Sequence, residues 1–340
     1  MSKIHNHTYP TWLITHPLWI RWLWKFKITV YPRTQFLKKR LLDLNPIFSN
    51  SIWIDLGAGD GEFSFLGDAK ARLLLDKSAD NIEFLRTYSM KKFRETQNMA
   101  DSIRIQQCDL NNSEELKAVL DWGKFSKSFD NTELEWRLKP ETQNQLIANS
   151  NRIFTLFSVL QYVSEPDRVL SDLHAIMSQN DLLILYIPVN QHQHFGLYKW
   201  MFQRFANYEI LQNRQHIFKT PELLKLLSEC GFKVVELQKL YGKWGIASHE
   251  LNSMCFMAMS HSNFLVKLLG ILSYLWVWPL IQVLNGLERM SWNKNHDSSA
   301  HVFFEHSKFE NSTVVKNEYI PVNSLDLPKH NGLYVELKKR

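Results

Sequence analysis

The chain has 340 residues with a formal net charge of +6, and 45% of its residues are hydrophobic. Its 12 Gly and 11 Pro are too few for a fibrous or low-complexity chain, so the composition predicts a globular protein. The three cysteines, Cys108, Cys230 and Cys255, have no CxxC spacing, which argues against a zinc site and a disulfide framework and favours the cytoplasm.

The first segment, 1–50, is rich in Trp and basic residues. It carries eight Lys or Arg residues against the single acidic residue Asp43, so the positive charge is concentrated here. Trp interleaved with cations suits a membrane–water interface and favours peripheral contact with an anionic surface. The same pattern also suits a helix packed on the core with its Lys ammonium groups in solvent. The segment lacks an uninterrupted apolar run, so we expect no secretory signal peptide.

The next segment, 51–240, alternates short apolar runs with helical periods and is predicted to be the core domain. Helical periods are expected at 79–88, at 166–177 and at 221–230, the last with Thr220 as its N-cap. The runs predicted to be strands are 52–56, 72–76, 102–106, 152–157, 182–187 and 232–237, with a closing strand at 333–337 inside a last segment, 326–340. This alternation predicts an α/β fold with a mostly parallel seven-stranded sheet and helices on both faces.

Two segments interrupt the alternation. The polar stretch 111–151 is expected to be a helix plus a surface insertion. The segment 241–325 is expected to be a helical apolar cap or a membrane-facing insertion, because 264–284 is almost entirely apolar. As a helix that stretch would reach ~30 Å, enough to span a bilayer, yet an interfacial helix or a buried cap helix fits the same residues.

The most informative motif directly follows the first predicted strand. Glycines at 57, 59 and 61 permit positive φ and close approach of a ligand, as expected of a tight strand-to-helix turn. The dinucleotide fingerprint is GxGxxG, whereas this motif is GxGxG. Asp55 and Asp60 would repel a pyrophosphate and attract a cation, so the motif favours a positively charged ligand.

The stretch from Asp55 to Gly61 resembles motif I of class I S-adenosylmethionine (SAM)-dependent methyltransferases. Asp76 stands where that family has a ribose-binding acid, and Asp109 stands where an Asp meets the adenine amino group, although it could instead cap a helix. The stretch 157–166 resembles motif IV of the ubiquinone-biosynthesis-like (type 11) subgroup. The resemblance covers about 51–240 and implies a Rossmann-like SAM methyltransferase fold. The SAM contacts that it implies are Asp55, Gly57, Ala58, Gly59, Asp60, Gly61, Asp76, Lys77, Asp109, Leu110, Phe157, Ser158 and Gln161.

The acceptor side is less clearly marked. His192 and His194 follow the fifth predicted strand, where ligands of open α/β sheets bind, so one of them is a candidate general base; both could equally be surface residues. Tyr162 is a third candidate. We expect no metal, because no Cys or carboxylate cluster accompanies the two histidines.

These features predict SAM-dependent methyl transfer to a hydrophobic or membrane-associated small molecule, such as a lipid, a quinone or a lipid-linked glycan precursor. A small-molecule methyltransferase with a buried cap is the rival among enzymes. Gln161 and Tyr162 replace the Glu-His pair that is common in motif IV, which keeps open a non-catalytic scaffold or assembly factor at a membrane surface. Nucleic acid is not the expected substrate, and the motifs select neither the acceptor atom nor an oligomeric state.

Overall fold

The computed structural model describes residues 32–89, 102–120, 150–189, 194–204, 215–259, 261, 263–296 and 332–340. The Trp-rich stretch up to residue 31, most of the polar insertion 111–151 and the candidate base His192 lie outside these residues.

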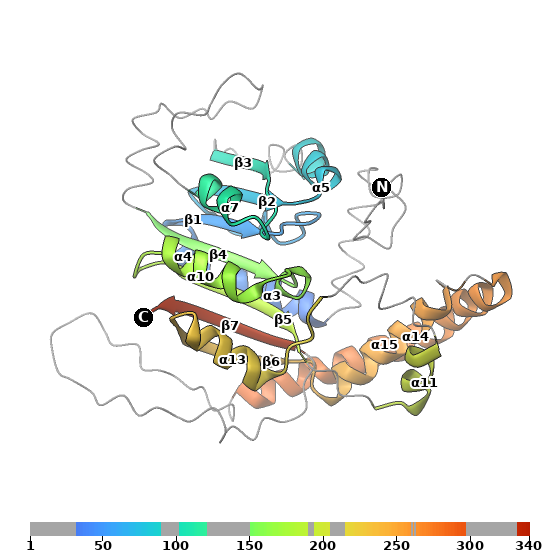
Figure 1. The fold of residues 1–340 in the computed structure, drawn as a ribbon. Coiled ribbons are helices and arrows are strands. Elements are labelled where there is room, and N and C mark those ends of the chain that lie inside the picture. Colours follow the sequence, from blue (N-terminus) through green and yellow to red (C-terminus); the bar gives the residue numbers. More distant parts are fainter. Residues whose placement is uncertain are drawn as a thin grey trace.

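Within the described residues, seven strands form one sheet in the order β3-β2-β1-β4-β5-β7-β6 (Figure 1). Strands β1 to β5 are parallel, and β7 is antiparallel to both of its neighbours. The strands are β1 (Ser51–Leu56), β2 (Ala71–Asp76), β3 (Ser102–Gln107), β4 (Asn151–Phe157), β5 (Leu182–Pro188), β6 (Phe232–Leu240) and β7 (Gly332–Lys339). Every predicted strand is confirmed, and the fold is the predicted Rossmann-like α/β fold.

Burial on both faces explains why the central strands read as continuous apolar runs. In β1, Ile52 and Ile54 pack into one hydrophobic cluster, and Trp53 between them packs into a second cluster on the other face. Successive side chains of a strand point to opposite faces, so a strand covered on both sides needs apolar residues at every position.

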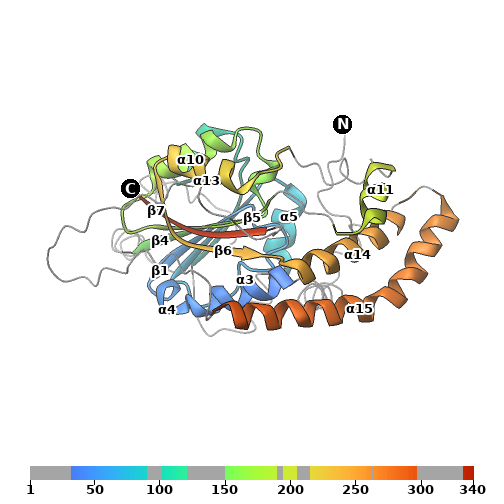
Figure 2. The ribbon, with the colours of Figure 1, turned by 90° about the horizontal axis from the view of Figure 1, so that it is seen from below.

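Helices cover both faces of the sheet (Figure 2). One face carries α7 (Ser113–Leu120), α10 (Pro166–Ile176) and α13 (Thr220–Glu229), and the other carries α3 (Pro32–Asp43) and α4 (Asn45–Phe48). Helix α5 (Ala79–Phe84) continues into a π-helical turn, Leu85–Ser89, as the predicted period 79–88 implied. The predicted cap of α13 is one residue off: Lys219 has the extended N-cap backbone, and Thr220 is already helical.

A helical hairpin extends from the sheet beyond β6. It consists of α14 (Lys243–Met259) and α15 (Phe264–His296), and α11 (Gly196–Arg204) packs against α14. The predicted apolar helix 264–284 is confirmed and continues to His296. The hairpin projects beyond the carboxyl end of β4 (Figure 1), and in Figure 2 part of α15 runs beneath α3 while the rest of the helix curves away from the sheet.

The strand order places a ligand site. The chain proceeds from β1 outward to β2 and β3, then returns to β4 on the other side of β1. The carboxyl ends of β1 and β4 therefore flank the point where the winding direction reverses, which is where open α/β sheets bind ligands.

Candidate functional site

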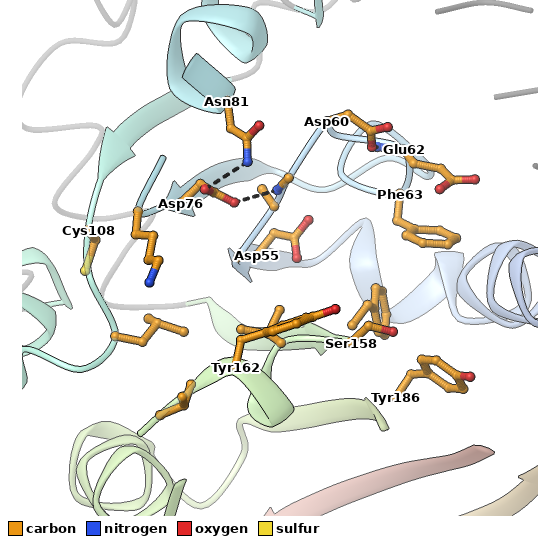
Figure 3. Close-up of a pocket in the computed structure, with 18 of the residues that line it drawn as sticks. Asp55, Asp60, Glu62, Phe63, Asp76, Asn81, Cys108, Ser158, Tyr162 and Tyr186 are labelled. Atoms are coloured by element: carbon orange, nitrogen blue, oxygen red, sulfur yellow. Dashed lines mark hydrogen bonds between the residues drawn. The ribbon is translucent and has the colours of Figure 1, made fainter. Parts of the chain in front are cut away.

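A cavity of about 280 Å³ lies at the carboxyl ends of β1, β2 and β4 (Figure 3). All predicted SAM contacts except Gly61 and Gln161 line it. Those that do are Asp55, Gly57, Ala58, Gly59, Asp60, Asp76, Lys77, Asp109, Leu110, Phe157 and Ser158. The candidate Tyr162 lines it as well.

The glycine turn after β1 is held against the end of β2. The backbone N–H groups of Gly57 and Ala58 both donate to the carbonyl oxygen of Leu75, at 2.7 and 2.9 Å. Gly57 has a φ of +76°, and a Cβ atom at this residue would lie 2.5 Å from Cγ2 of Val159, in the loop after β4. Glycine is therefore required here both by the backbone and by the close approach of a second loop.

Replacing Gly57 by alanine is expected to destabilise the fold by about 2–3 kcal/mol, because a positive φ and a steric clash are combined. Gly59→Ala is the matched control, since its φ is +58° but a Cβ there meets nothing within 4 Å. It should cost about 1 kcal/mol. In urea unfolding, Val159→Ala should cost less in the Gly57→Ala background than alone, because it relieves the clash. Additive effects of the two substitutions would refute the contact.

No helix follows the glycine turn, contrary to the strand-to-helix turn that the sequence suggested. Residues 57–70 form turns, in keeping with the low helix propensity of four glycines in eleven residues. Without a helix, the backbone carbonyls of this turn need other hydrogen-bond donors, and the buried side chain of Arg72 on β2 supplies them. Its guanidinium donates to the carbonyl oxygens of Ser64 (3.2 Å), Ala69 (3.4 Å), Leu66 (3.4 Å) and Gly67. The turn therefore presents no helix N-terminus to the cavity, which removes the usual reason for a phosphate to bind there.

Asp55 is a buried carboxylate in the centre of the cavity wall, with 4% of its surface exposed. Its two oxygens accept hydrogen bonds from the hydroxyls of Ser64 (2.5 Å) and Thr155 (2.7 Å). Burial nevertheless raises the pKa of Asp55 to about 6, and the nearby Asp76 carboxylate adds to the rise. A carboxylate in this state gains from a cation placed beside it.

Asp76 ends β2 and is the second acidic group of the cavity (Figure 3). One oxygen accepts the backbone N–H of Gly59 (2.8 Å), and the other accepts the N–H of Ser78 (2.8 Å) and the side-chain amide of Asn81 (3.0 Å). Three donors thus fix the carboxylate. Asn81 also lines the cavity, and the sequence did not reveal it because it sits one turn into α5 with no motif around it.

The end of β3 contributes Asp109 and Leu110 to the wall. Asp109 accepts hydrogen bonds from the backbone and side-chain amides of Asn111, at 3.0 and 2.9 Å. The side chain of Asn112, not that of Asp109, accepts the N–H of Glu115 in the first turn of α7. The alternative reading of Asp109 as a helix cap is therefore wrong.

The loop after β4 forms the opposite wall. Ser158 has a φ of +58°, rare for a non-glycine residue, and its N–H donates to the carbonyl oxygen of Tyr186 (2.8 Å). Gln161 lies behind this wall: its side chain is buried, and its carbonyl oxygen accepts the N–H groups of Gln215 (2.8 Å) and His216 (3.1 Å). Gln161 is not among the residues that line the cavity, so its contact with the cofactor stays a prediction.

The cavity has an acidic end and an aromatic end. Asp76 and Asn81 lie at the acidic end with Asp55 next to them, and Phe63 and Tyr186 lie at the aromatic end, where Asp60 and Glu62 also lie beside Phe63 (Figure 3). Tyr162 extends across the cavity with its hydroxyl toward Ser158. The rings of Phe63 and Phe157 pack edge to face with centroids 5.3 Å apart.

Helix α3 closes the aromatic end, which the sequence did not reveal. Arg33, Thr34 and Leu37 line the cavity, and the Arg33 guanidinium lies 5.8 Å from the centroid of the Tyr186 ring. Because of their positive charge, the sequence predicts residues 1–50 to be separate from the core domain. Leu37 and Leu41 on the buried side of α3 nevertheless belong to the core.

His194 is the candidate base that lies within the described residues, and it does not line the cavity. Its backbone N–H donates to Glu250 on α14 (2.7 Å), as does that of Phe195 (2.8 Å). The structure thus places this loop against the hairpin and gives the His194 side chain no contact with the cavity wall.

No protein-family model matches the sequence, and no curated protein matches it either. Solved structures do match its fold. Magnesium protoporphyrin IX methyltransferase from Synechocystis PCC 6803 with bound SAH is 13% identical, with coverage of 61% of this chain and 77% of that one and a TM-score of 0.38. Geranyl diphosphate methyltransferase in complex with SAM is 11% identical, with coverage of 91% and 84% and a TM-score of 0.42. The [4+2]-cyclase SpnF is 10% identical, with coverage of 89% and 80% and a TM-score of 0.43.

Such values assign neither an activity nor a substrate to this chain, and a shared fold does not fix chemistry. The strand order, the antiparallel β7 and the glycine turn at the switch point are features of the chain itself. By these features the chain has the Rossmann-like α/β fold of the class I SAM-dependent methyltransferases.

Proposed function

We propose that the protein binds SAM in this cavity and transfers its methyl group to a hydrophobic, membrane-associated small molecule such as a lipid, a quinone or a lipid-linked glycan precursor. The observation that carries the proposal is one cavity in which the carboxylates of Asp55 and Asp76 lie near the aromatic rings of Phe63 and Tyr186, with Asp60 and Glu62 beside Phe63. A cation and an apolar molecule can lie side by side in such a space.

The residues of the acidic end fit SAM. Asp76 would accept hydrogen bonds from the ribose hydroxyls, and Asp55 would face the cationic amino acid portion, where its raised pKa would fall again. Asp109 and Leu110 would line the adenine site. When bound, SAM supplies an electrophilic methyl group: the acceptor lone pair bonds to its carbon as the carbon–sulfur bond breaks and its electrons return to sulfur.

The chain's own contribution is to position the acceptor and exclude water. Phe63, Phe157 and Tyr186 form an apolar surface next to the acidic end, and Tyr162 crosses between the two ends. Positioning alone can supply much of the rate of a direct displacement.

Incubation with SAM carrying a radiolabelled methyl group tests the proposal. Label should move into organic-extractable material when a total membrane lipid extract is supplied, and it should not do so with an aqueous extract. Transfer to the aqueous extract alone would contradict the hydrophobic acceptor, and no transfer to either would contradict the activity.

The pH dependence of SAM binding is a separate prediction. Asp55 has a pKa of about 6 in the free protein, so it is protonated below that pH and loses its attraction for a cation. Since the amino group of the ligand stays protonated up to about pH 7.5, the Kd should be about tenfold larger at pH 5 than on a plateau near pH 7. Calorimetry across this range checks the slope. Asp55→Asn should bind weakly and without the slope, and a wild-type Kd that does not change with pH would contradict the role of Asp55.

A further inference from the structure

Helix α15 exposes an apolar surface that the fold leaves uncovered. The stretch Phe264–Ser291 is long and apolar enough to cross a membrane, yet only 11% of its most apolar window is buried. Trp276 is 85% exposed, and Leu265, Leu269 and Leu275 are each more than 60% exposed. An exposed apolar patch of this extent marks a site of contact with a membrane or with another protein.

The exposed residues follow the helical repeat. Gly270, Ile281, Leu284 and Glu288 are buried on the side of α15 that faces the protein. At 100° per residue, the opposite side carries Pro279, Gly286 and six exposed large apolar residues, and we call these six the outer face. The outer face consists of Leu265, Leu268, Leu272, Trp276, Val283 and Met290. At 1.5 Å per residue it is about 37 Å long.

We infer that the outer face of α15 lies on an anionic lipid bilayer, with the helix on the membrane surface and not across it. This docking surface deepens the proposed function, since it supplies the membrane association on which that proposal rests. It does not depend on methyl transfer itself.

The inner side of α15 explains why the helix lies on the bilayer and does not span it. Asn285 accepts the hydroxyl of Ser248 (2.6 Å), and the buried Glu288 carboxylate accepts the N–H groups of Gly242 (2.6 Å) and Gly245 (2.9 Å). Surrounding α15 with lipid would break these contacts and carry a carboxylate toward hydrocarbon, at a cost of several kcal/mol. A helix held in this way can offer lipid only its outer face.

The charges of α15 favour anionic lipid over a protein partner. Lys267 and Arg289 are both exposed, and their separation of 22 positions brings them to the same flank of the helix, between the outer face and the buried side, with no charged residue from 268 to 287. Trp278 lies on that flank too. A protein interface of this length would use about one hydrogen bond per 100–200 Å², whereas the outer face has no polar side chain.

The position of α15 links this surface to the cavity. In Figure 2, α3, α4 and α15 lie along one side of the molecule, and α10 and α13 lie along the other. Helix α3 contacts α15 and also lines the aromatic end of the cavity through Arg33 and Leu37. A bilayer under α15 would therefore lie on the α3 side of the molecule, the side of the aromatic end of the cavity.

Vesicle binding by matched variants tests the surface. Leu272→Lys/Val283→Lys places two charges on the outer face, whereas Ser273→Lys adds a charge at a neighbouring exposed residue off that face. With phosphatidylcholine vesicles that contain phosphatidylglycerol, the double variant should bind at least tenfold more weakly, and Ser273→Lys should bind as well as the wild type. Equal binding by all three proteins, or none by the wild type, would overturn the inference.

Depth measurements test the orientation. Spin labels on Leu268→Cys, Leu272→Cys and Val283→Cys, each in a Cys230→Ser background, should each report a shallow depth from oxygen and nickel accessibility; Cys108 and Cys255 are buried. A depth that is greatest at the middle of α15 and falls toward both ends would indicate a span and overturn the inference. Spin labels that are shielded from nickel but do not enter the lipid, together with a doubled mass in light scattering, would overturn the inference and assign the outer face to contact with a second copy of the chain.

SAM calorimetry on the same variants separates the two proposals. Unchanged SAM affinity with lost vesicle binding is expected of the Lys double variant, because its substitutions lie outside the cavity wall. If all three spin labels report a shallow depth but the wild-type protein does not bind SAM, the docking surface is supported and the proposed function alone is overturned.

Discussion

Replacing Asp76 by alanine is expected to weaken SAM binding more than 100-fold. The substitution removes a carboxylate that would accept hydrogen bonds from the ribose, and such charge-assisted bonds contribute about 1.5–3 kcal/mol each. It also releases the N–H of Gly59, which Asp76 holds at 2.8 Å, so the glycine turn loses its anchor to β2. Calorimetric titration of SAM measures the effect.

The control for charge is Asp80→Ala. Asp80 is exposed in the first turn of α5, four residues from Asp76, and does not line the cavity. Its loss should change the SAM affinity by less than about twofold, because exposed charges are screened. Asp76→Asn should also bind poorly, since three donors face the side chain and an amide has one acceptor atom. Near-wild-type binding by Asp76→Ala would contradict the assignment of the ribose site.

Replacing Arg72 by methionine is expected to destabilise the protein by about 3–4 kcal/mol and to weaken SAM binding as well. Arg72 is fully buried, and its guanidinium donates to four carbonyl groups of the β1–β2 connection. Without Arg72 these carbonyls are buried with no hydrogen-bond donor, which costs about 1–3 kcal/mol of stability each. Part of this cost is offset because the guanidinium no longer has to be desolvated on folding. Ser64 belongs to the same turn and bonds to Asp55, so the cavity loses its shape too.

Arg152→Met is the matched comparison. Arg152 is also a mostly buried Arg on a central strand, but it bonds to Asp181 (2.6 Å) at the amino end of β4, away from the cavity. In urea unfolding, Arg152→Met should lose a similar amount of stability. At a temperature where the variant stays folded, its affinity for SAM should equal that of the wild type. An Arg72→Met variant within about 1 kcal/mol of the wild type would refute the bracing role of Arg72.

The strands of the core could be predicted from the sequence because both faces of the sheet are buried. The run 52–56 is apolar at nearly every position and was placed correctly, as were the other strands. The glycine turn was recognisable for a similar reason, since positive φ and a 2.5 Å approach to Val159 leave glycine as the one residue type that fits.

The parts that could not be predicted depend on contacts between segments far apart in the chain. Nothing around Arg72 shows that its guanidinium braces a turn that lacks a helix, because the local pattern is that of an ordinary strand. Arg33 and Leu37 line the cavity because α3 packs on the face of the sheet that carries Tyr186 of β5. Such relations are set by tertiary packing and leave no local signal.

The length of the apolar helix was underestimated for a related reason. The pattern after residue 284 becomes polar with Asn285 and Glu288, which read as the end of an apolar helix. In the fold these side chains bond to α14 and to the turn before it, so the helix continues to His296.

Calorimetric titration of SAM into the intact protein tests the central claim most directly. The fold, the two buried carboxylates and the glycine turn predict one site per chain with a micromolar Kd. No heat of binding and no thermal stabilisation by SAM, for protein that unfolds cooperatively, would contradict the account and favour a methyltransferase-fold scaffold without a cofactor.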